Sequence, residues 1–166
     1  MRWLIDGYNV IRRDADLRGH EQESLEAGRS ALLAVIGAAA RRTGDQFTVV
    51  FDGARRDAQA ASSGQVQIVF SRPPETADDV LRAMAVKAGA GTAVASSDRA
   101  VRNAARRAGA VAVSAEDFVA AVRGSVDPDD GGDDDDRPGN RGGNPRRASR
   151  DDRAARRALA RLRARA

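Results

Sequence analysis

The chain contains no cysteine and a single histidine, His20. Without cysteine it needs no oxidising compartment and cannot hold a metal through thiolates. One histidine in a charged stretch is too little for a zinc site. No serine stands in the G-x-S-x-G context of a serine hydrolase, so that kind of nucleophilic catalysis has no support either. The candidates for chemistry are therefore the carboxylates.

Long apolar runs are also absent. No run approaches the roughly 20 residues that a membrane helix requires. The first residues reach the charges of Arg2 and Asp6 too early for a signal peptide. We therefore expect a soluble, cytoplasmic protein with no membrane partner.

Lysine is nearly absent as well, since 27 of the 28 basic residues are arginine and Lys87 is the exception. The formal charge of +4 hides a strong asymmetry along the chain. Residues 125–136 carry only acidic charges, whereas residues 137–166 carry eleven arginines against two aspartates. Residues 125–148 have almost no apolar side chains and cannot repay the entropy of ordering, so we expect a disordered linker there.

The Arg- and Ala-rich segment 149–166 is expected to be a helical tail, because Ser149 can cap a helix with Asp152 at its third position. Two functions are open for this end of the chain. It can be a basic arm that adds salt-sensitive affinity for a polyanion, or the acidic run can fold back on the arginines and inhibit binding. Residues 1–124 then form one domain of common size.

Residues 1–124 alternate between apolar runs of strand length and segments whose apolar residues recur at helical spacing. Strands that are apolar throughout and are separated by helices indicate a mostly parallel sheet covered on both faces. We therefore predict an α/β fold with three layers, α/β/α, whose five strands lie in the order 3-2-1-4-5 with right-handed crossovers. The predicted strands are Trp3–Asp6, Phe47–Asp52, Val66–Phe70, Thr92–Ser97 and Ala110–Val113, and the predicted helices are Ser24–Arg42, Glu75–Ala88, Asp98–Ala108 and one capped by Ser114.

Two acidic residues follow the central strands of this predicted sheet. Asp6 closes the first strand and Asp98 follows the fourth, so both belong at the point where the strand order reverses. Carboxylates gathered at one edge of a sheet are typical ligands of magnesium. Each residue also has a simpler alternative, since Asp6 can belong to an Asp-Gly turn and Asp98 can cap the following helix.

The helix predicted to begin near Thr76 carries further acids. Asp79 can complete a capping box with Thr76, which is a structural role. Capping does not require Asp78, which lies at the margin of the apolar stripe and is therefore the better candidate ligand. Glu75 precedes the helix and is a supporting candidate.

Asn9, Ser97 and Asp52 are also supporting candidates. Asn9 can hydrogen-bond Asp6 or a metal-bound water, or it can bond only within the local turn. Ser97 can donate a hydrogen bond to a phosphate near a helix terminus. Asp52 ends the second strand, one strand away from the centre, and is either an outer ligand or a turn residue.

Arginines near the same edge indicate where a polyanion can bind. Acids at the centre with arginines around them suit a phosphodiester polymer whose phosphate meets a metal ion. A solvated helix face is an equally simple explanation for any one of these arginines. The candidate RNA-binding residues are Arg99, Arg102 and Arg106 on one predicted helix, and Arg55 and Arg56 after the second strand.

Four segments of the chain, taken in order, form a combination more specific than any one of them: Leu4-Ile5-Asp6-Gly7-Tyr8-Asn9-Val10-Ile11, Val50-Phe51-Asp52, Glu75-Thr76-Ala77-Asp78, and Ser97-Asp98 followed by Gly109-Ala110. Together they resemble the YacP-like NYN domain, a branch of the PIN-like nuclease fold. The resemblance covers roughly residues 1–120 and implies a metal-dependent endoribonuclease that hydrolyses RNA phosphodiester bonds. It implies that Asp6, Asp78 and Asp98 are catalytic acids that bind Mg²⁺ or Mn²⁺, with Asn9 in support.

One bacterial member of that family is a ribosome-associated mRNA endonuclease, so the resemblance implies RNA, and with it the ribosome, as partners. The chain departs from the family pattern in two places that bear on targeting. The stretch between Asp52 and Val66 is short and alanine-rich. After Gly124, an acidic linker and an arginine tail stand where relatives have a more ordered helical extension.

Two other function classes remain open. The first is a non-catalytic RNA- or ribosome-binding module on the same fold, although a pure RNA binder has little reason to gather negative charge. The second is a phosphatase or phosphoacceptor domain, which needs a lysine near a nucleophilic aspartate. Lys87, late in a predicted helix, is the one lysine available.

Overall fold

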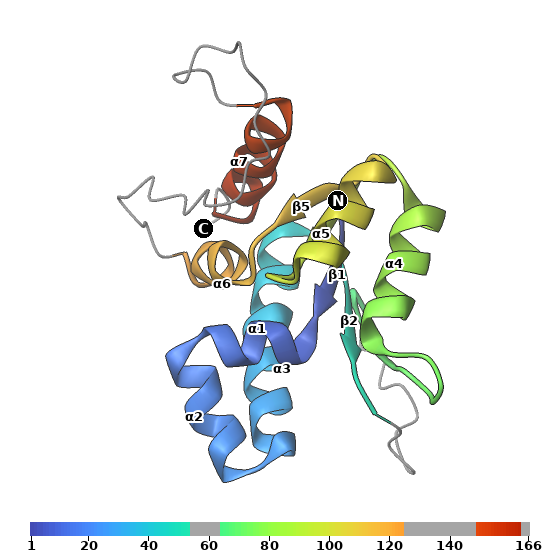
Figure 1. Ribbon diagram of the computed structural model, residues 1–166. Coiled ribbons are helices and arrows are strands. Elements are labelled where there is room, and N and C mark those ends of the chain that lie inside the picture. The colour runs from blue at the N-terminus through green and yellow to red at the C-terminus, as the bar shows by residue number, and fades with distance from the viewer. Residues whose placement is uncertain (54–63, 125–148, 164–166) are drawn as a thin grey trace.

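The computed structural model describes residues 1–53, 64–124 and 149–163. Within these ranges, strands and helices follow one another along the chain (Figure 1). No helix in this described part is long and apolar enough to cross a membrane. The strands are β1 (Arg2–Asp6), β2 (Gln46–Phe51), β3 (Val66–Phe70), β4 (Thr92–Ala95) and β5 (Val111–Val113), and the helices are α1 (Gly7–Arg13), α2 (Ala15–Glu23), α3 (Leu25–Thr43), α4 (Ala77–Ala88), α5 (Arg99–Arg107), α6 (Ala115–Arg123) and α7 (Arg150–Arg163).

The strands form one five-stranded sheet in the order β3-β2-β1-β4-β5, and all four pairings are parallel. The predicted α/β fold and strand order are therefore confirmed. The central strand β1 pairs on both sides, with Trp3 beside Phe47 of β2 and Ala93 of β4. The carboxyl ends of β1 and β4 are neighbours, and the strand order reverses between them, which is where ligands of such sheets bind.

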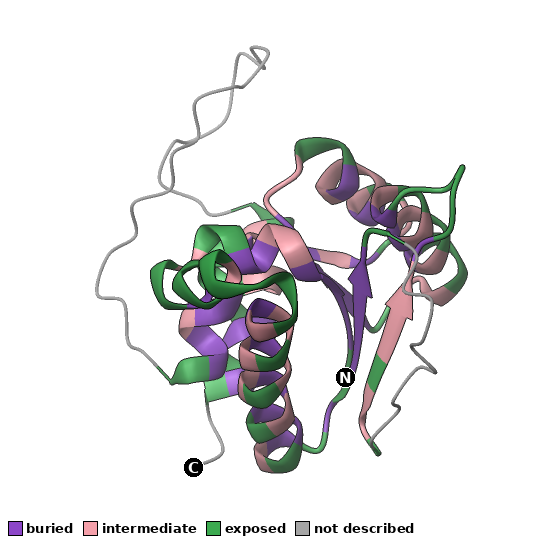
Figure 2. Cartoon of the chain, turned by 90° about the horizontal axis from the view of Figure 1, so that it is seen from below, coloured by how far each residue is buried: buried purple, intermediate pink, exposed green. Residues whose placement is uncertain are grey.

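Helices cover both faces of the sheet, and the strands bury side chains on each. Trp3 and Ile5 share one core with side chains of α1, α2, α3, α6 and α7. Leu4 belongs instead to the core formed with α4 and α5. Figure 2 shows the buried strands running between the helices. Because side chains of a strand alternate between its faces, Asp6 lies on the same face as Leu4, toward α4 and α5.

Short polar side chains fix the starts of the helices around the carboxyl edge. Asp6 caps α1 and Asp98 caps α5. Thr76 and Asp79 form the predicted capping box at the start of α4. The capping roles weighed for Asp98 and Asp79 are thus confirmed. Capping also places each of these carboxylates at the positive end of a helix.

Residues 7–23, to which the sequence analysis assigns no element, form α1 and α2. The only buried residue of α2 is Leu17, so its sequence has no apolar stripe that periodicity could detect. Asp14 caps α2 by accepting a hydrogen bond from the Leu17 amide at 2.9 Å. Arg123 of α6 donates to the same carboxylate at 2.8 Å. The start of α2 is therefore fixed by a helix cap and an ion pair, which an amphipathic pattern does not reveal.

The Arg- and Ala-rich end is helical over Arg150–Arg163, as expected, but the helix is not a tail separate from the domain. Ala158, Leu159 and Leu162 are buried in the same core as β1. This docking is not predicted from the sequence, because arginines outnumber the apolar residues of the segment and hide its short Ala-Leu stripe. The predicted linker 125–148 lies outside the described residues.

A buried carboxylate joins α7 to the amino-terminal end of the sheet. Asp45 is fully buried and accepts hydrogen bonds from the α-amino group of Met1 at 2.6 Å and from Trp3 Nε1 at 3.2 Å. The guanidinium of Arg161 in α7 lies 3.0 Å from it. Burial raises the pKa of Asp45, but the bonds from the amino group, Arg161 and Trp3 outweigh burial and hold that pKa below its ordinary value.

Candidate active site

Asp6 is the most enclosed carboxylate at the carboxyl edge of the sheet, with 8% of its surface exposed. Its Oδ1 accepts a hydrogen bond from the Asn9 amide at 3.2 Å, and its Oδ2 accepts one from Ser96 Oγ at 3.0 Å. Burial raises the pKa of Asp6 above its ordinary value, and the negative charges of Asp78 and Asp98 raise it further. The two hydrogen bonds oppose this rise without cancelling it.

Asp78 lies in the first turn of α4 and is half-buried. Its pKa is also raised, first by burial and then by the charge of Asp98. Arg82, one turn further along the helix, lies 3.5 Å from Asp78 Oδ2 and lowers the pKa in part. The charges of Asp78 and Asp98 therefore act on Asp6, and the charge of Asp98 acts on Asp78, although the three residues come from three separate elements.

Asp98 is tied to Asp6 through a buried serine. The hydroxyl of Ser96, which is fully buried, donates to Asp6 and accepts a 3.0 Å hydrogen bond from the Asp98 amide. Asp98 Oδ1 accepts in turn from the Val101 amide at 2.9 Å, which caps α5. Ser96 thus fixes the loop after β4 against the end of β1 and sets the spacing of the two acids.

Asp52 acts on this site through the start of α4. Its Oδ1 accepts hydrogen bonds from Ser71 Oγ at 2.7 Å and from the Ala77 amide at 3.3 Å. Asp52 therefore connects the end of β2 to the first residue of the helix that carries Asp78, and its charge also raises the pKa of Asp78. Ser71 is not among the residues predicted from the sequence, where its one signal is that it is the first polar residue after an apolar strand.

The other acids of this segment lie at its surface. Asp79 accepts from the amide and hydroxyl of Thr76, and these bonds lower the pKa of Asp79 below its ordinary value. Arg82 also pairs with Asp79, at 3.2 Å. Glu75 is exposed and precedes α4. The positions of Asp79 and Glu75 beside Asp78 keep them as supporting candidates, with capping the role that geometry gives Asp79.

Asn9 and Ser97 connect α1 to the loop that follows β4. The Asn9 side-chain oxygen accepts a 2.7 Å hydrogen bond from the Ser97 amide, while the Asn9 backbone amide is the group that donates to Asp6. The Ser97 hydroxyl donates to Glu116 of α6 and accepts from the Ala115 amide. Its proton is therefore engaged within the protein rather than presented to a phosphate.

The predicted RNA-binding arginines are distributed along the molecule. Arg99 is exposed in the first turn of α5, next to Asp98. Arg102 is partly buried, and its Nε has no hydrogen-bond partner. Arg106 lies near the far end of α5, where it bonds Asn103 at 3.3 Å and faces Asp151 of α7 at 3.9 Å. Arg55 and Arg56 lie outside the described residues.

The chemistry of the acidic side chains fits a hard divalent cation. All candidate ligands are carboxylate oxygens, the donors that Mg²⁺ and Mn²⁺ prefer. A cation would offset the burial and the neighbouring negative charges that together raise the pKa of Asp6 and of Asp78. Among the residues that the structure describes, no group of three or more acidic or histidine side chains is arranged to hold a metal ion. Binding would therefore require side-chain adjustment or ligands from water and substrate.

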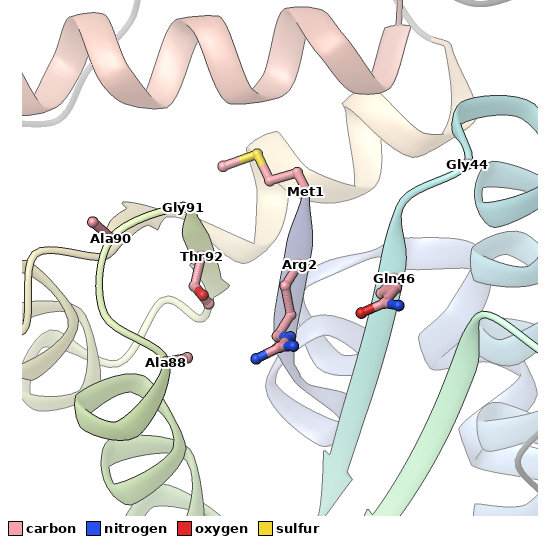
Figure 3. Close-up of a pocket in the computed structure, with 8 residues that line it drawn as sticks. All are labelled: Met1, Arg2, Gly44, Gln46, Ala88, Ala90, Gly91 and Thr92. Atoms are coloured by element: carbon pink, nitrogen blue, oxygen red, sulfur yellow. The ribbon is translucent and has the colours of Figure 1, made fainter.

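A separate hollow lies at the opposite, amino-terminal edge of the sheet (Figure 3). Its volume is about 440 Å³, and Arg2, Gln46 and Thr92 contribute the polar side chains of its lining. Because β1 begins at Arg2 and ends at Asp6, this hollow and the acids lie at opposite ends of the same strand. The hollow is therefore not part of the acidic site.

The model of the YacP-like NYN domain matches residues 3–159 of the chain. The match includes most of α7, in agreement with the packing of that helix on the domain. Among curated proteins, YacP of Bacillus subtilis (strain 168), described as uncharacterized, is 29% identical over 84 residues. That alignment spans 49% of this chain and 49% of the relative, about half the length of each.

Two crystal structures of Rae1 (YacP) from Bacillus subtilis are similar to this fold. One matches with a TM-score of 0.64 at 26% identity, and a mutant form matches with a TM-score of 0.63 at 28% identity. Each match covers 74% of this chain and 74% of the other. The NYN domain is a PIN-like fold of nuclease type, and its nucleases generally use divalent metals. The chain belongs to the YacP-like NYN domain family.

Proposed function

We propose that this protein is a metal-dependent endoribonuclease whose centre is formed by Asp6, Asp78 and Asp98. The observation that carries the proposal is that Asp6 is buried near the negative charges of Asp78 and Asp98. All three lie at the sheet edge where the strand order reverses. A fold gains nothing from this repulsion, so a functional role is the better explanation. Nuclease-type relatives support RNA as the substrate.

The three acids would hold Mg²⁺ or Mn²⁺, and a bound ion of this kind activates a water and neutralises charge on the scissile phosphate. The protein's own contribution is positioning. Asp6 is held on both oxygens, by Ser96 and by the Asn9 amide, so it cannot turn away from the edge. Asp98 is fixed as the cap of α5.

Asp78 is positioned less directly, through the start of its helix. Asp52 bonds the Ala77 amide and so fixes the first turn of α4 against β2. Arg82 pairs with Asp78 from the solvent side. In this arrangement Asp52, Ser96 and Asn9 are positioning residues, and the acids they orient are the groups that meet metal and substrate.

The proposal also includes where in the cell the protein acts. Action on mRNA at the ribosome, in the cytoplasm, is part of this proposal, and the exposed arginines of α5 and α7 supply charge for such a polyanion. The alternative is a non-catalytic RNA-binding module on the same fold. Retention of three mutually repelling carboxylates at one edge argues against that alternative.

The test is cleavage of an end-labelled single-stranded RNA in magnesium, manganese or EDTA. Asp78→Asn should abolish metal-dependent cleavage while leaving the far-ultraviolet circular dichroism unchanged. Asp151→Asn is the matched control, because it makes the same change in the first turn of α7, far from the acids. Equal cleavage by wild type and Asp78→Asn would exclude this centre. Tight binding without cleavage by wild type, on free RNA and on translating ribosomes alike, would favour the binding module.

A further inference from the structure

Three aromatic rings form a row at the carboxyl edge of the sheet. Phe51 and Phe70 are the last residues of β2 and β3, and Tyr8 lies in the first turn of α1. Phe51 lies between the other two, with ring centroids 5.2 Å from Tyr8 and 5.7 Å from Phe70. Phe51 is fully buried, whereas Tyr8 and Phe70 are only partly buried. The central ring, Phe51, therefore lies in the core, and the two outer rings, Tyr8 and Phe70, reach solvent.

Two guanidinium groups lie against the partly exposed rings. Arg29 of α3 donates from Nη1 to the Tyr8 hydroxyl at 2.7 Å, and its Cζ lies 5.9 Å from the centre of the Phe70 ring. Arg12 lies over the Tyr8 ring at 5.5 Å and pairs with Glu21 at 3.4 Å, with 63% of its side chain exposed. Stacked arginines and aromatic rings are the surface on which unpaired nucleobases stack.

Gly7 is the reason that this row lies so close to Asp6. A Cβ on residue 7 would come within 2.3 Å of the Phe51 ring. Only glycine lets the chain pass directly from Asp6 over Phe51 to Tyr8. Asp6 and Tyr8 are therefore only two residues apart, and the backbone between them passes close to the Phe51 ring.

The rings and the acids lie on opposite faces of the same sheet edge. Phe51 belongs to the core shared with α1 and α3, whereas Asp6 points toward α4 and α5. A single strand of nucleic acid that crosses this edge could place a phosphate at the acids and a neighbouring base at the rings. Arginines at the rings suit the negative charge of the same strand.

We propose that Tyr8, Arg29 and Phe70 form a subsite that stacks one unpaired base of single-stranded RNA next to the acids, a proposal that rests on the proposed nuclease function. Stacking is tolerant of base identity, because every base has a π-face. The subsite therefore selects single-stranded RNA over duplex, in which the bases are already stacked on one another.

The test measures the affinity of a fluorescent single-stranded RNA in EDTA, where no cleavage occurs. Tyr8→Leu should weaken binding about tenfold, within the range for loss of one stacked base, whereas Tyr8→Phe keeps the ring and should bind within about twofold of wild type. Phe70→Leu provides a second variant if Tyr8→Leu fails to fold. A scan with single abasic nucleotides should find one position at which wild type loses about tenfold and Tyr8→Leu loses nothing more.

Equal affinity of wild type, Tyr8→Leu and Phe70→Leu would overturn the subsite. So would an abasic penalty that is the same in wild type and in the leucine variant that folds. These outcomes are distinct from failure of the nuclease centre. If the centre is wrong, Asp78→Asn still cleaves, whatever the ring variants do to binding; if only the subsite is wrong, Asp78→Asn loses cleavage while the ring variants bind as wild type does.

Discussion

Replacing Leu162 by alanine tests whether α7 belongs to the folded domain. Leu162 is fully buried in the core shared with β1, α3 and α6. Truncation of a fully buried leucine costs about 2–5 kcal/mol, since transfer energy is lost and a cavity is left. A domain of ordinary stability has about 5–15 kcal/mol in total, so the loss should be large.

Urea unfolding followed by circular dichroism measures this effect. With a slope of about 1–3 kcal/mol per molar urea, a loss of about 3 kcal/mol lowers the midpoint by about 1–3 M. Arg157→Ala is the matched control on the same helix, because Arg157 is exposed and its loss should change stability by no more than about 0.5 kcal/mol. A Leu162→Ala protein as stable as this control would refute the docking of α7.

Further predictions concern the carboxylates and the glycine at the sheet edge. Gly7→Ala should lower stability by about 1–3 kcal/mol, because its Cβ would overlap the Phe51 ring; an unchanged melting temperature would contradict this. The lowered pKa of Asp45 means that its stabilisation is present above pH 3.8 and is lost as pH falls below it, so Asp45→Asn should flatten the acid limb of stability. The raised pKa of Asp6 has the opposite sign, so in the metal-free protein the contribution of Asp6 to stability should fall as pH rises above 3.8, and Asp6→Asn should remove this contribution in an EDTA titration. Ser96→Ala removes a bond that lowers the Asp6 pKa, so the acid limb of the cleavage rate should move to higher pH.

The strand order and the edge that carries the acids are predictable from the sequence because they follow from local signals. Each strand is an apolar run, and each run is followed by a polar residue, so Asp6 and Asp98 could be placed at neighbouring strand ends. The capping box of Thr76 and Asp79 is equally local, since it spans one helical turn. These features need no knowledge of which distant segments meet.

Contacts between distant segments could not be predicted in the same way. Asp52 reads as a turn residue, and its bond to the Ala77 amide depends on where α4 begins relative to β2. Asp45 is a buried carboxylate that contacts α7, and its partners Met1 and Arg161 are distant from each other in the sequence. The polar helix α2 gives no amphipathic signal, because its one buried side chain is Leu17.

The most direct measurement of the central claim is the rate at which Asp6→Asn cleaves a single-stranded RNA in magnesium, beside wild type. Asp6 is the acid that both the hydrogen bonds and the neighbouring charges converge on. Outer-shell changes at metal sites typically cost 10–100-fold, so loss of a carboxylate that holds the ion should cost at least about 100-fold. A folded Asp6→Asn protein that cleaves at least about 100-fold more slowly agrees with the account. One that cleaves at the wild-type rate contradicts it.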